Sequence, residues 1–193
     1  MKNNSRQTGI LIPAMAIALL AGFGCASNPP QSSSTAPEIK PAAAMPVVPA
    51  AAKLMLKVVK ADSEETAGED GKAANAVDGD PNTHWHTQWQ DASPPCPHEI
   101  VIELPPATTI KGFTYLPRQD DSENGTIKGY EFYVSNDGQD FGQPVAKGEW
   151  ENSKELKTVT FAPTACRFIK LKALSEVNDG AWTSAAEIGV VPQ

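Results

Sequence analysis

The pattern of apolar and polar residues changes at about residue 53. Before that position the chain shows no alternation, whereas after it apolar residues recur at every second place in short runs, which is typical of half-buried β-strands. The runs expected to form strands are 54–58, 84–89, 98–104, 110–116, 129–135, 156–161, 167–173 and 186–191. No stretch has the period of a long helix, and loops rich in Pro, Gly and Asn separate the runs. The pattern therefore predicts an all-β, antiparallel β-sandwich over residues 53–193, of either immunoglobulin-like or jelly-roll type.

Residues 1–24 have the layout of a secretory signal peptide. Lys2 and Arg6 precede an apolar run over 10–21, and small residues lead up to Cys25. The run is shorter than the about 20 apolar residues that cross a bilayer, so a permanent transmembrane helix is not expected. A cysteine at this place resembles the bacterial lipoprotein signal, in which the new N-terminal cysteine carries acyl chains such as palmitate. An ordinary signal peptide that leaves Cys25 as a free thiol is the alternative.

Residues 25–52 are rich in Ser, Ala and Pro and carry almost no charge. Such a segment buries too little apolar surface to offset its ordering entropy, so we expect a disordered tether. Together with a lipidated Cys25, the tether predicts a domain displayed from a bacterial cell envelope, at the outer membrane or cell surface. Contact with the membrane is expected through the lipid anchor alone, and secretion is the alternative.

The chain is acidic, with a formal net charge of −7. Cleavage ahead of Cys25 removes Lys2 and Arg6 and would make the charge −9. An acidic domain repels phosphate backbones, so nucleic acid is not an expected partner. In an exported protein the two remaining cysteines, Cys96 and Cys166, are expected to form a disulfide bond.

The stretch 78–89, Asp-Gly-Asp-Pro-Asn-Thr-His-Trp-His-Thr-Gln-Trp, concentrates most of the chemistry. Its turn gathers Asp and Thr oxygens, which suit a hard cation such as calcium. If a strand follows, His84, His86 and Gln88 lie on one face and Trp85, Thr87 and Trp89 on the other. We interpret the stretch as a metal-braced loop that presents a polar and aromatic patch to a small polar ligand, a sugar.

Other sites fit the same residues poorly. An EF-hand would need Gly where Thr83 stands and Glu where Trp89 stands. A zinc site would draw on His84, His86, His98 and Cys96, but the expected disulfide occupies Cys96 and oxygen ligands dominate nearby. No nucleophile elbow is present, so an enzyme is not expected.

Five segments resemble, in order, the motifs of one known family. They are Asn75-Ala-Val-Asp-Gly-Asp-Pro-Asn-Thr-His-Trp-His-Thr, Phe113-Thr-Tyr-Leu-Pro-Arg-Gln119, Asn124-Gly-Thr-Ile-Lys-Gly-Tyr-Glu-Phe-Tyr-Val-Ser, Arg167-Phe-Ile-Lys-Leu and Trp182-Thr-Ser-Ala-Ala-Glu-Ile. From about residue 55 onward the chain resembles the coagulation-factor type C or discoidin-like domain. More narrowly, it is similar to the family 32 carbohydrate-binding modules of bacterial sialidases and galactose oxidases. The resemblance implies a jelly-roll β-sandwich that binds without catalysis, because catalysis in this family comes from separate domains.

The resemblance also implies a structural calcium ion (Ca2+) in the Asp-Gly turn. Its ligands would be the carbonyls of Asn75, Asp80, Thr83 and Ala186, the Thr83 hydroxyl, and the carboxylates of Asp78 and Glu187. All are oxygens, as a hard cation requires, and they join the turn to the last strand.

The resemblance further implies a galactose-type sugar site made of Glu69, His86, Trp89, Arg118 and Asn124. An exposed indole such as that of Trp89 covers the C–H face of galactose, and the polar side chains bond its hydroxyls. The implied partners are glycans containing galactose or N-acetylgalactosamine, bound by a monomeric domain. Trp150 and Trp182 are interpreted as packing residues. The alternative function is a discoidin-like domain that binds a protein or phospholipid partner.

Overall fold

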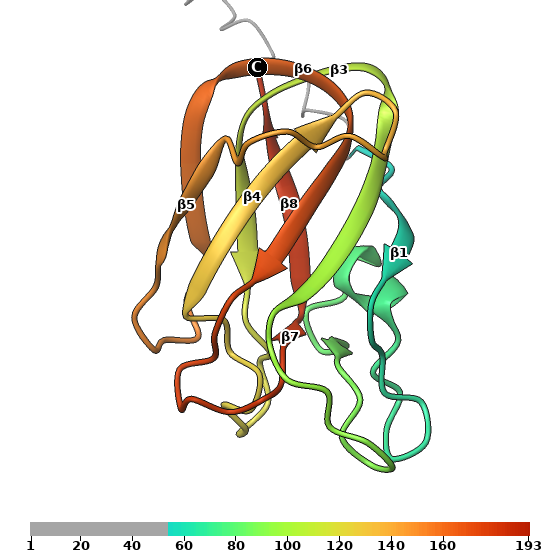
Figure 1. Cartoon of the computed structure of the whole chain (residues 1–193), viewed down its shortest axis with the longest axis vertical. Helices are drawn as coiled ribbons and strands as arrows, with labels where there is room; N and C mark the ends of the chain where they lie inside the picture. Colours follow the sequence, from blue (N-terminus) through green and yellow to red (C-terminus); the bar gives the residue numbers. More distant parts are fainter. Residues whose placement is uncertain (1–53) are drawn as a thin grey trace, which may run out of the picture. The chain divides into compact units, whose positions relative to one another are not determined.

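The computed structural model describes residues 54–193 (Figure 1). The predicted signal peptide, the lipidation of Cys25 and the tether lie outside the described residues, so these expectations stay predictions. Within the described part, no helix has the length and apolar character needed to cross a membrane.

The described residues form antiparallel strands and a single short 3-10 helix. The elements in chain order are β1 (Lys57–Ala61), η1 (Ala73–Val77), β2 (Trp85–His86), β3 (His98–Leu116), β4 (Gly129–Ser135), β5 (Ala146–Glu149), β6 (Lys157–Ala173), β7 (Ser184–Ala185) and β8 (Glu187–Pro192). The main sheet has the order β1-β3-β6-β4-β5, with β8 also on β3, and β2 pairs with β7. The all-β, antiparallel prediction is confirmed, and the short strand β5 had no clear signal in the sequence pattern.

Two long strands, β3 and β6, run through the whole sandwich. Ile100 in the first half of β3 pairs with Leu171, whereas Thr114 in its second half pairs with Thr158. The register shifts between Glu103 and Thr108, where prolines that lack an N–H interrupt the ladder and the strand bends back over the top of the sandwich (Figure 1). The predicted pairs of strands, 98–104 with 110–116 and 156–161 with 167–173, are therefore each one bent strand.

The core lies where the two halves of the bent strands face each other. Phe113 from the second half of β3 stacks on Phe132 from β4, with ring centroids 3.9 Å apart. Trp150 stacks on Tyr130, also at 3.9 Å. The largest fully buried apolar side chains are Trp85, Tyr115, Phe113, Phe132, Ile100, Ile102, Ile110, Ile127, Ile169, Leu171 and Ile188. Burying each such side chain contributes about 1.5–3 kcal/mol, so this cluster holds the sandwich together.

The predicted disulfide between Cys96 and Cys166 is wrong, because both cysteines are free thiols. Cys96 precedes β3, whose first residue pairs with Ala173 at the end of β6, whereas Cys166 lies seven residues earlier on that strand. At about 3.3 Å per residue this places the two cysteines roughly 20 Å apart, far beyond the about 7 Å that a disulfide allows between Cα atoms. Burial raises the pKa of the Cys166 thiol to about 11, which keeps it protonated.

The strand pairing gathers several loops at one end of the sandwich. His98 at the start of β3 and Tyr130 at the start of β4 both pair with Ala173 at the end of β6. The loops that flank these residues, together with the loop after β3, therefore meet at the lower end of the molecule in Figure 1. The stretch 78–89 belongs to this loop end.

Candidate functional site

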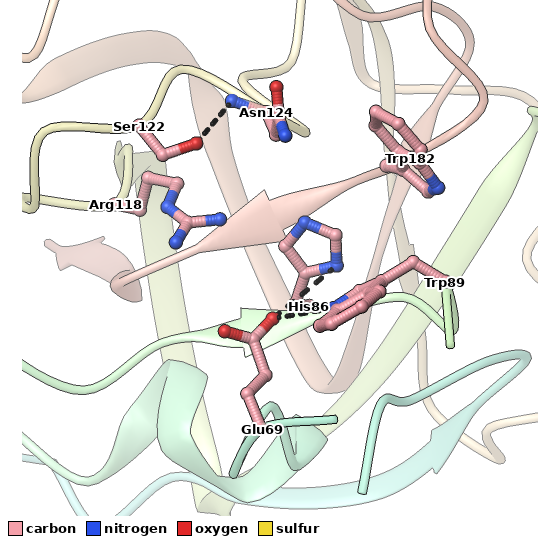
Figure 2. Close-up of a pocket in the computed structure, with 7 residues that line it drawn as sticks. All are labelled: Glu69, His86, Trp89, Arg118, Ser122, Asn124 and Trp182. Atoms are coloured by element: carbon pink, nitrogen blue, oxygen red, sulfur yellow. Dashed lines mark hydrogen bonds and ion pairs between the residues drawn. The ribbon is translucent and has the colours of Figure 1, made fainter. Parts of the chain in front are cut away.

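A pocket of about 250 Å³ opens at the loop end (Figure 2). Its lining residues are Glu69, His86, Trp89, Arg118, Ser122, Asn124 and Trp182. All five residues predicted to bind sugar are among them, although they come from separate parts of the chain. The structure thus brings the predicted set together, while their role in sugar binding stays a prediction.

Trp89 forms an exposed aromatic wall of the pocket. The residue is 38% exposed, and its Nε1 donates a hydrogen bond of 2.9 Å to Oε1 of Glu69. The indole lies directly over Gly68, since a Cβ atom at that glycine would come within 2.6 Å of the ring. The absent side chain at Gly68 therefore lets the indole lie flat against the loop, with its position fixed by Glu69.

The predicted strand over 84–89 is wrong beyond His86, where β2 ends. Thr87 is fully buried, and Trp89 lines the pocket with His86 instead of lying on the face of Trp85. The cause is a hydrogen-bonding partner that strand periodicity does not reveal. The backbone N–H of Trp89 donates to the Glu65 carboxylate at 2.8 Å, so the chain turns away from the strand direction.

His86 supplies a hydrogen-bond acceptor. Its Nδ1 is 2.6 Å from the carbonyl oxygen of Thr87, which can only accept, so Nδ1 carries the proton. Burial lowers the pKa of His86, and the ring is neutral at pH 7. Its Nε2 therefore has a free lone pair, and Figure 2 shows this side of the ring directed into the pocket.

Arg118 is only 7% exposed and is held by Asp120. Its Nε donates to Oδ1 at 2.7 Å and its Nη2 to Oδ2 at 2.5 Å, a bidentate pair that lowers the pKa of the Asp120 carboxyl. The pairing with Asp120 resembles an ordinary surface ion pair in sequence, but the burial of Arg118 gives the guanidinium one orientation beside the pocket. Among the described residues no hydrogen bond occupies its Nη1.

Two lining residues escaped the sequence prediction. Trp182 was interpreted as a packing residue, yet it lines the pocket with its ring centroid 6.4 Å from that of His86. Ser122 accepts a hydrogen bond of 3.2 Å from the backbone N–H of Asn124 and shapes the loop that carries this asparagine. Trp182 lies two residues ahead of β7, and β7 pairs with β2, so the strand pairing brings Trp182 beside His86; the sequence pattern carried no signal of this pairing.

Several of the predicted calcium ligands lie together in the Asp-Gly turn. The Thr83 hydroxyl is 2.8 Å from Oδ2 of Asp78 and 3.0 Å from the carbonyl of Asp80. Asn75 belongs to η1, which packs against β8, the strand that begins at Glu187 directly after Ala186. These oxygen donors fit a hard cation, and calcium stays a prediction.

The residues of the rejected zinc site have other partners. His98 is buried, with Nδ1 2.8 Å from Oδ2 of Asp62 and Nε2 2.9 Å from the Ala181 carbonyl. The Cys96 thiol faces the same carbonyl at 3.6 Å. No cluster of three or more His, Cys, Asp or Glu side chains suited to a metal occurs in residues 54–193.

Comparisons with known proteins agree with this geometry. The family model described as the F5/8 type C domain matches residues 59–188. The "Sialidase" of Micromonospora viridifaciens is 40% identical over 139 residues, which are 72% of this chain and 21% of that protein. The "Galactose oxidase" of Gibberella zeae is 38% identical over 133 residues, which are 68% of this chain and 19% of that protein. The chain thus spans about a fifth of the length of these relatives.

Solved structures of carbohydrate-binding modules are also similar to this chain. CpGH89CBM32-5 from Clostridium perfringens, in complex with GalNAc-beta-1,3-galactose, is 40% identical with a TM-score of 0.64, and the match covers 70% of this chain and 94% of that one. The family 32 CBM from C. perfringens NanJ, in complex with galactose, is 34% identical with a TM-score of 0.60, covering 70% and 92%. These structural relatives are jelly-roll domains, so the jelly-roll prediction is confirmed.

Proposed function

The chain belongs to the F5/8 type C domain family, with family 32 carbohydrate-binding modules as its relatives, and we propose that it binds the terminal galactose-type sugar of a glycan. The observation that carries this proposal is the convergence of Glu69, His86, Trp89, Arg118 and Asn124 on one pocket. Galactose and GalNAc-beta-1,3-galactose in the two structural relatives support the sugar class.

The pocket suits one sugar ring. Its about 250 Å³ is below the roughly 300–1,000 Å³ of pockets for drug-sized ligands, so a single terminal residue fits and the rest of a glycan lies outside. The indole of Trp89 covers the apolar C–H face, and Trp182 forms a second aromatic wall. Glu69 and His86 accept from hydroxyl groups, Arg118 donates, and Asn124 does both.

The charges around the pocket favour an uncharged sugar. Among the described residues, Arg118 is the only Lys or Arg that lines the pocket, and Asp120 offsets its charge. Glu69 contributes a carboxylate, and its nearest basic neighbours are the histidines His84 and His86, at 3.6 and 3.9 Å. Burial lowers the pKa of both rings, so neither cancels the carboxylate at pH 7. A sulfated or carboxylated sugar would meet this charge without a free cation to offset it.

The same proposal includes a calcium ion held by Asn75, Asp78, Asp80, Thr83, Ala186 and Glu187. The ion would supply no reaction chemistry and would brace the turn against β8. The turn leads into β2 and His86, so a braced turn supports the pocket floor.

We further propose that the described residues bind without catalysing a reaction and that Cys25 and the tether display them from a bacterial envelope. A pocket for a single sugar ring implies weak affinity, on the order of millimolar to tens of micromolar. Many copies on one surface would strengthen attachment by avidity.

Calorimetric titration of the full chain with galactose tests the proposal. Trp89→Ala is expected to abolish binding while the melting temperature stays close to that of the wild type, because the indole is partly exposed. Leu156→Ala, an exposed apolar residue outside the pocket lining, is the matched control and should bind normally. Unchanged binding in Trp89→Ala would contradict the site. Binding to anionic liposomes in place of galactose would favour the phospholipid alternative.

A further inference from the structure

Glu65 is a fully buried carboxylate that lies outside the pocket lining. It accepts four backbone N–H groups. Oε1 accepts from Ala67 at 2.7 Å and from Gly68 at 2.9 Å. Oε2 accepts from Trp89 and from Gln90, both at 2.8 Å. Each carboxylate oxygen thus binds one of two chain segments that are more than 20 residues apart.

These two segments carry two walls of the pocket. The segment bound through Oε1 leads directly to Glu69, and the segment bound through Oε2 begins with Trp89 itself. The backbone of Glu65 reaches a third lining residue, because its N–H donates to the His86 carbonyl at 2.8 Å. One residue therefore connects Glu69, Trp89 and His86, although its own side chain does not reach the ligand space.

The carboxylate is neutralised by amide dipoles. No Lys, Arg or His in the described part of the chain lies within ion-pair distance of it. The hydrogen bonds from Trp89, Gly68 and Gln90 hold the pKa of Glu65 at about 2, so it is ionised at every physiological pH. Because all four partners are donors, the position requires a group that only accepts. A glutamine of nearly the same shape would turn an NH₂ group toward two N–H donors.

We propose that Glu65 is a positioning residue for sugar binding, which fixes Trp89 and Glu69 in the bound arrangement before the sugar arrives. This inference rests on the proposed function. The Nε1 of Trp89 already bonds Glu69 at 2.9 Å, and the indole already lies on Gly68. Ordering two loops at the moment of binding would reduce affinity, and the four hydrogen bonds make that ordering part of folding.

Two variants with matched chemistry test the role. Glu65→Gln keeps the size but loses the acceptor-only character, and the affinity for galactose is expected to fall at least about tenfold. Asp137→Asn is the control. Asp137 accepts N–H groups from Gln139 and Asp140, both at 2.9 Å, in the turn after β4 at the other end of that strand. Asp137→Asn should lower thermal stability and leave the affinity for galactose unchanged. Wild-type affinity in Glu65→Gln, or an equal loss in Asp137→Asn, would overturn the proposal.

Amide hydrogen exchange without sugar supplies a second readout that does not depend on the ligand. In Glu65→Gln the amides of Ala67, Gly68, Trp89 and Gln90 are expected to lose protection, while those of the long strands β3 and β6 keep it. Equal loss across the sandwich would mean a general structural role. Should Glu65→Gln fail to fold, Glu65→Asp keeps the charge with a shorter reach, and the same selective loss is expected. If Glu65→Gln shows this selective loss but the wild type binds no galactose, Glu65 still positions the two loops and the proposed function fails.

Discussion

The sandwich core and the loop end are held together by different interactions. In the core, rings such as Phe113 and Phe132 stack at 3.9 Å, and the side chains there are almost entirely apolar. At the loop end, buried carboxylates accept backbone N–H groups. Besides Glu65, Glu176 is 1% exposed and accepts from Asn178 and Gly180, both at 2.8 Å, in the loop that leads to Trp182.

The difference separates stability from binding. Apolar packing has little directionality, so it decides whether the sandwich forms but not where a loop atom lies. Hydrogen bonds to a carboxylate are directional and fix individual backbone atoms. We therefore expect core substitutions to unfold the protein and loop-end substitutions to weaken sugar binding in a folded protein.

The largest effect is expected in the core. Phe132→Ala removes a fully buried ring that stacks on Phe113, and it should lower the free energy of unfolding by about 3–5 kcal/mol. Chemical denaturation measures the change. The exposed Leu156 gives the control, since Leu156→Ala should change stability by less than about 0.5 kcal/mol. A similar loss of stability in both variants would mean that buried side chains contribute no more to stability than exposed ones.

Arg118 is expected to contribute directly to sugar binding. Arg118→Ala removes a buried guanidinium beside the pocket, and the galactose affinity should fall roughly 10- to 100-fold, as expected for a charge-assisted hydrogen bond. Arg167→Ala is the control, because Arg167 forms an exposed ion pair with Glu103 and lies outside the pocket lining. Titration of both variants checks the prediction. Normal affinity in Arg118→Ala would remove this residue from the site.

Removal of the proposed calcium ion is expected to lower the stability of the protein. Asp78→Ala or a chelator is expected to lower the melting temperature by several degrees, because loss of a ligand bound only by the folded state reduces stability. Added calcium should restore the chelated wild type but not the variant. Identical melting curves with chelator and with calcium would argue against the ion.

Acid should act on the loop end through His86. Burial holds its pKa below the ordinary value of about 6.5, so below that pH the unfolded chain binds more protons than the folded one and stability falls as pH falls. Protonation at Nε2 also replaces the acceptor with a donor, so galactose affinity should fall over the same range. His86→Gln should show a smaller loss of stability between pH 7.5 and pH 5.5, measured by thermal melting. An unchanged pH dependence would exclude His86 as its source.

His98 contributes with the opposite sign. Although burial lowers its pKa, the hydrogen bonds to Asp62 and to the Ala181 carbonyl raise it above the ordinary value. Its stabilising contribution is therefore present in acid and is lost as pH rises through its folded-state pKa. The His86→Gln comparison isolates one histidine because His98 is the same in both proteins.

The smallest effect is expected from reducing agent. Cys96 and Cys166 are free thiols far apart on the sandwich, so a reductant should leave the melting temperature unchanged within about 1 °C. A drop of many degrees would indicate a disulfide after all.

Sequence reasoning worked where a local pattern carries the information. Strand alternation located most strands. The five residues predicted to bind sugar came from resemblance to ordered family motifs, and the structure places all of them in one pocket.

The pattern failed where contacts join distant residues. Glu65 looks like an ordinary polar loop residue, because its partners Trp89 and Gln90 follow more than 20 positions later. The hydrogen bond from the Trp89 N–H to Glu65, which the sequence does not reveal, also ends the expected strand at His86. The cysteine pairing failed because counting thiols says nothing about where β3 and β6 place them.

The pairing of β1 and β8 with β3 places both ends of the described residues away from the pocket. Lys57 at the start of β1 pairs with Glu103, and Pro192 at the end of β8 pairs with Ile110, so both ends of the domain meet beside the bend of β3. Leu54 and Gln193 indeed border one hollow there with Pro105 and Pro106. The pocket lies at the loop end, opposite the bend of β3. A fusion partner or a solid support joined at either end of the domain would therefore leave the ligand entrance clear.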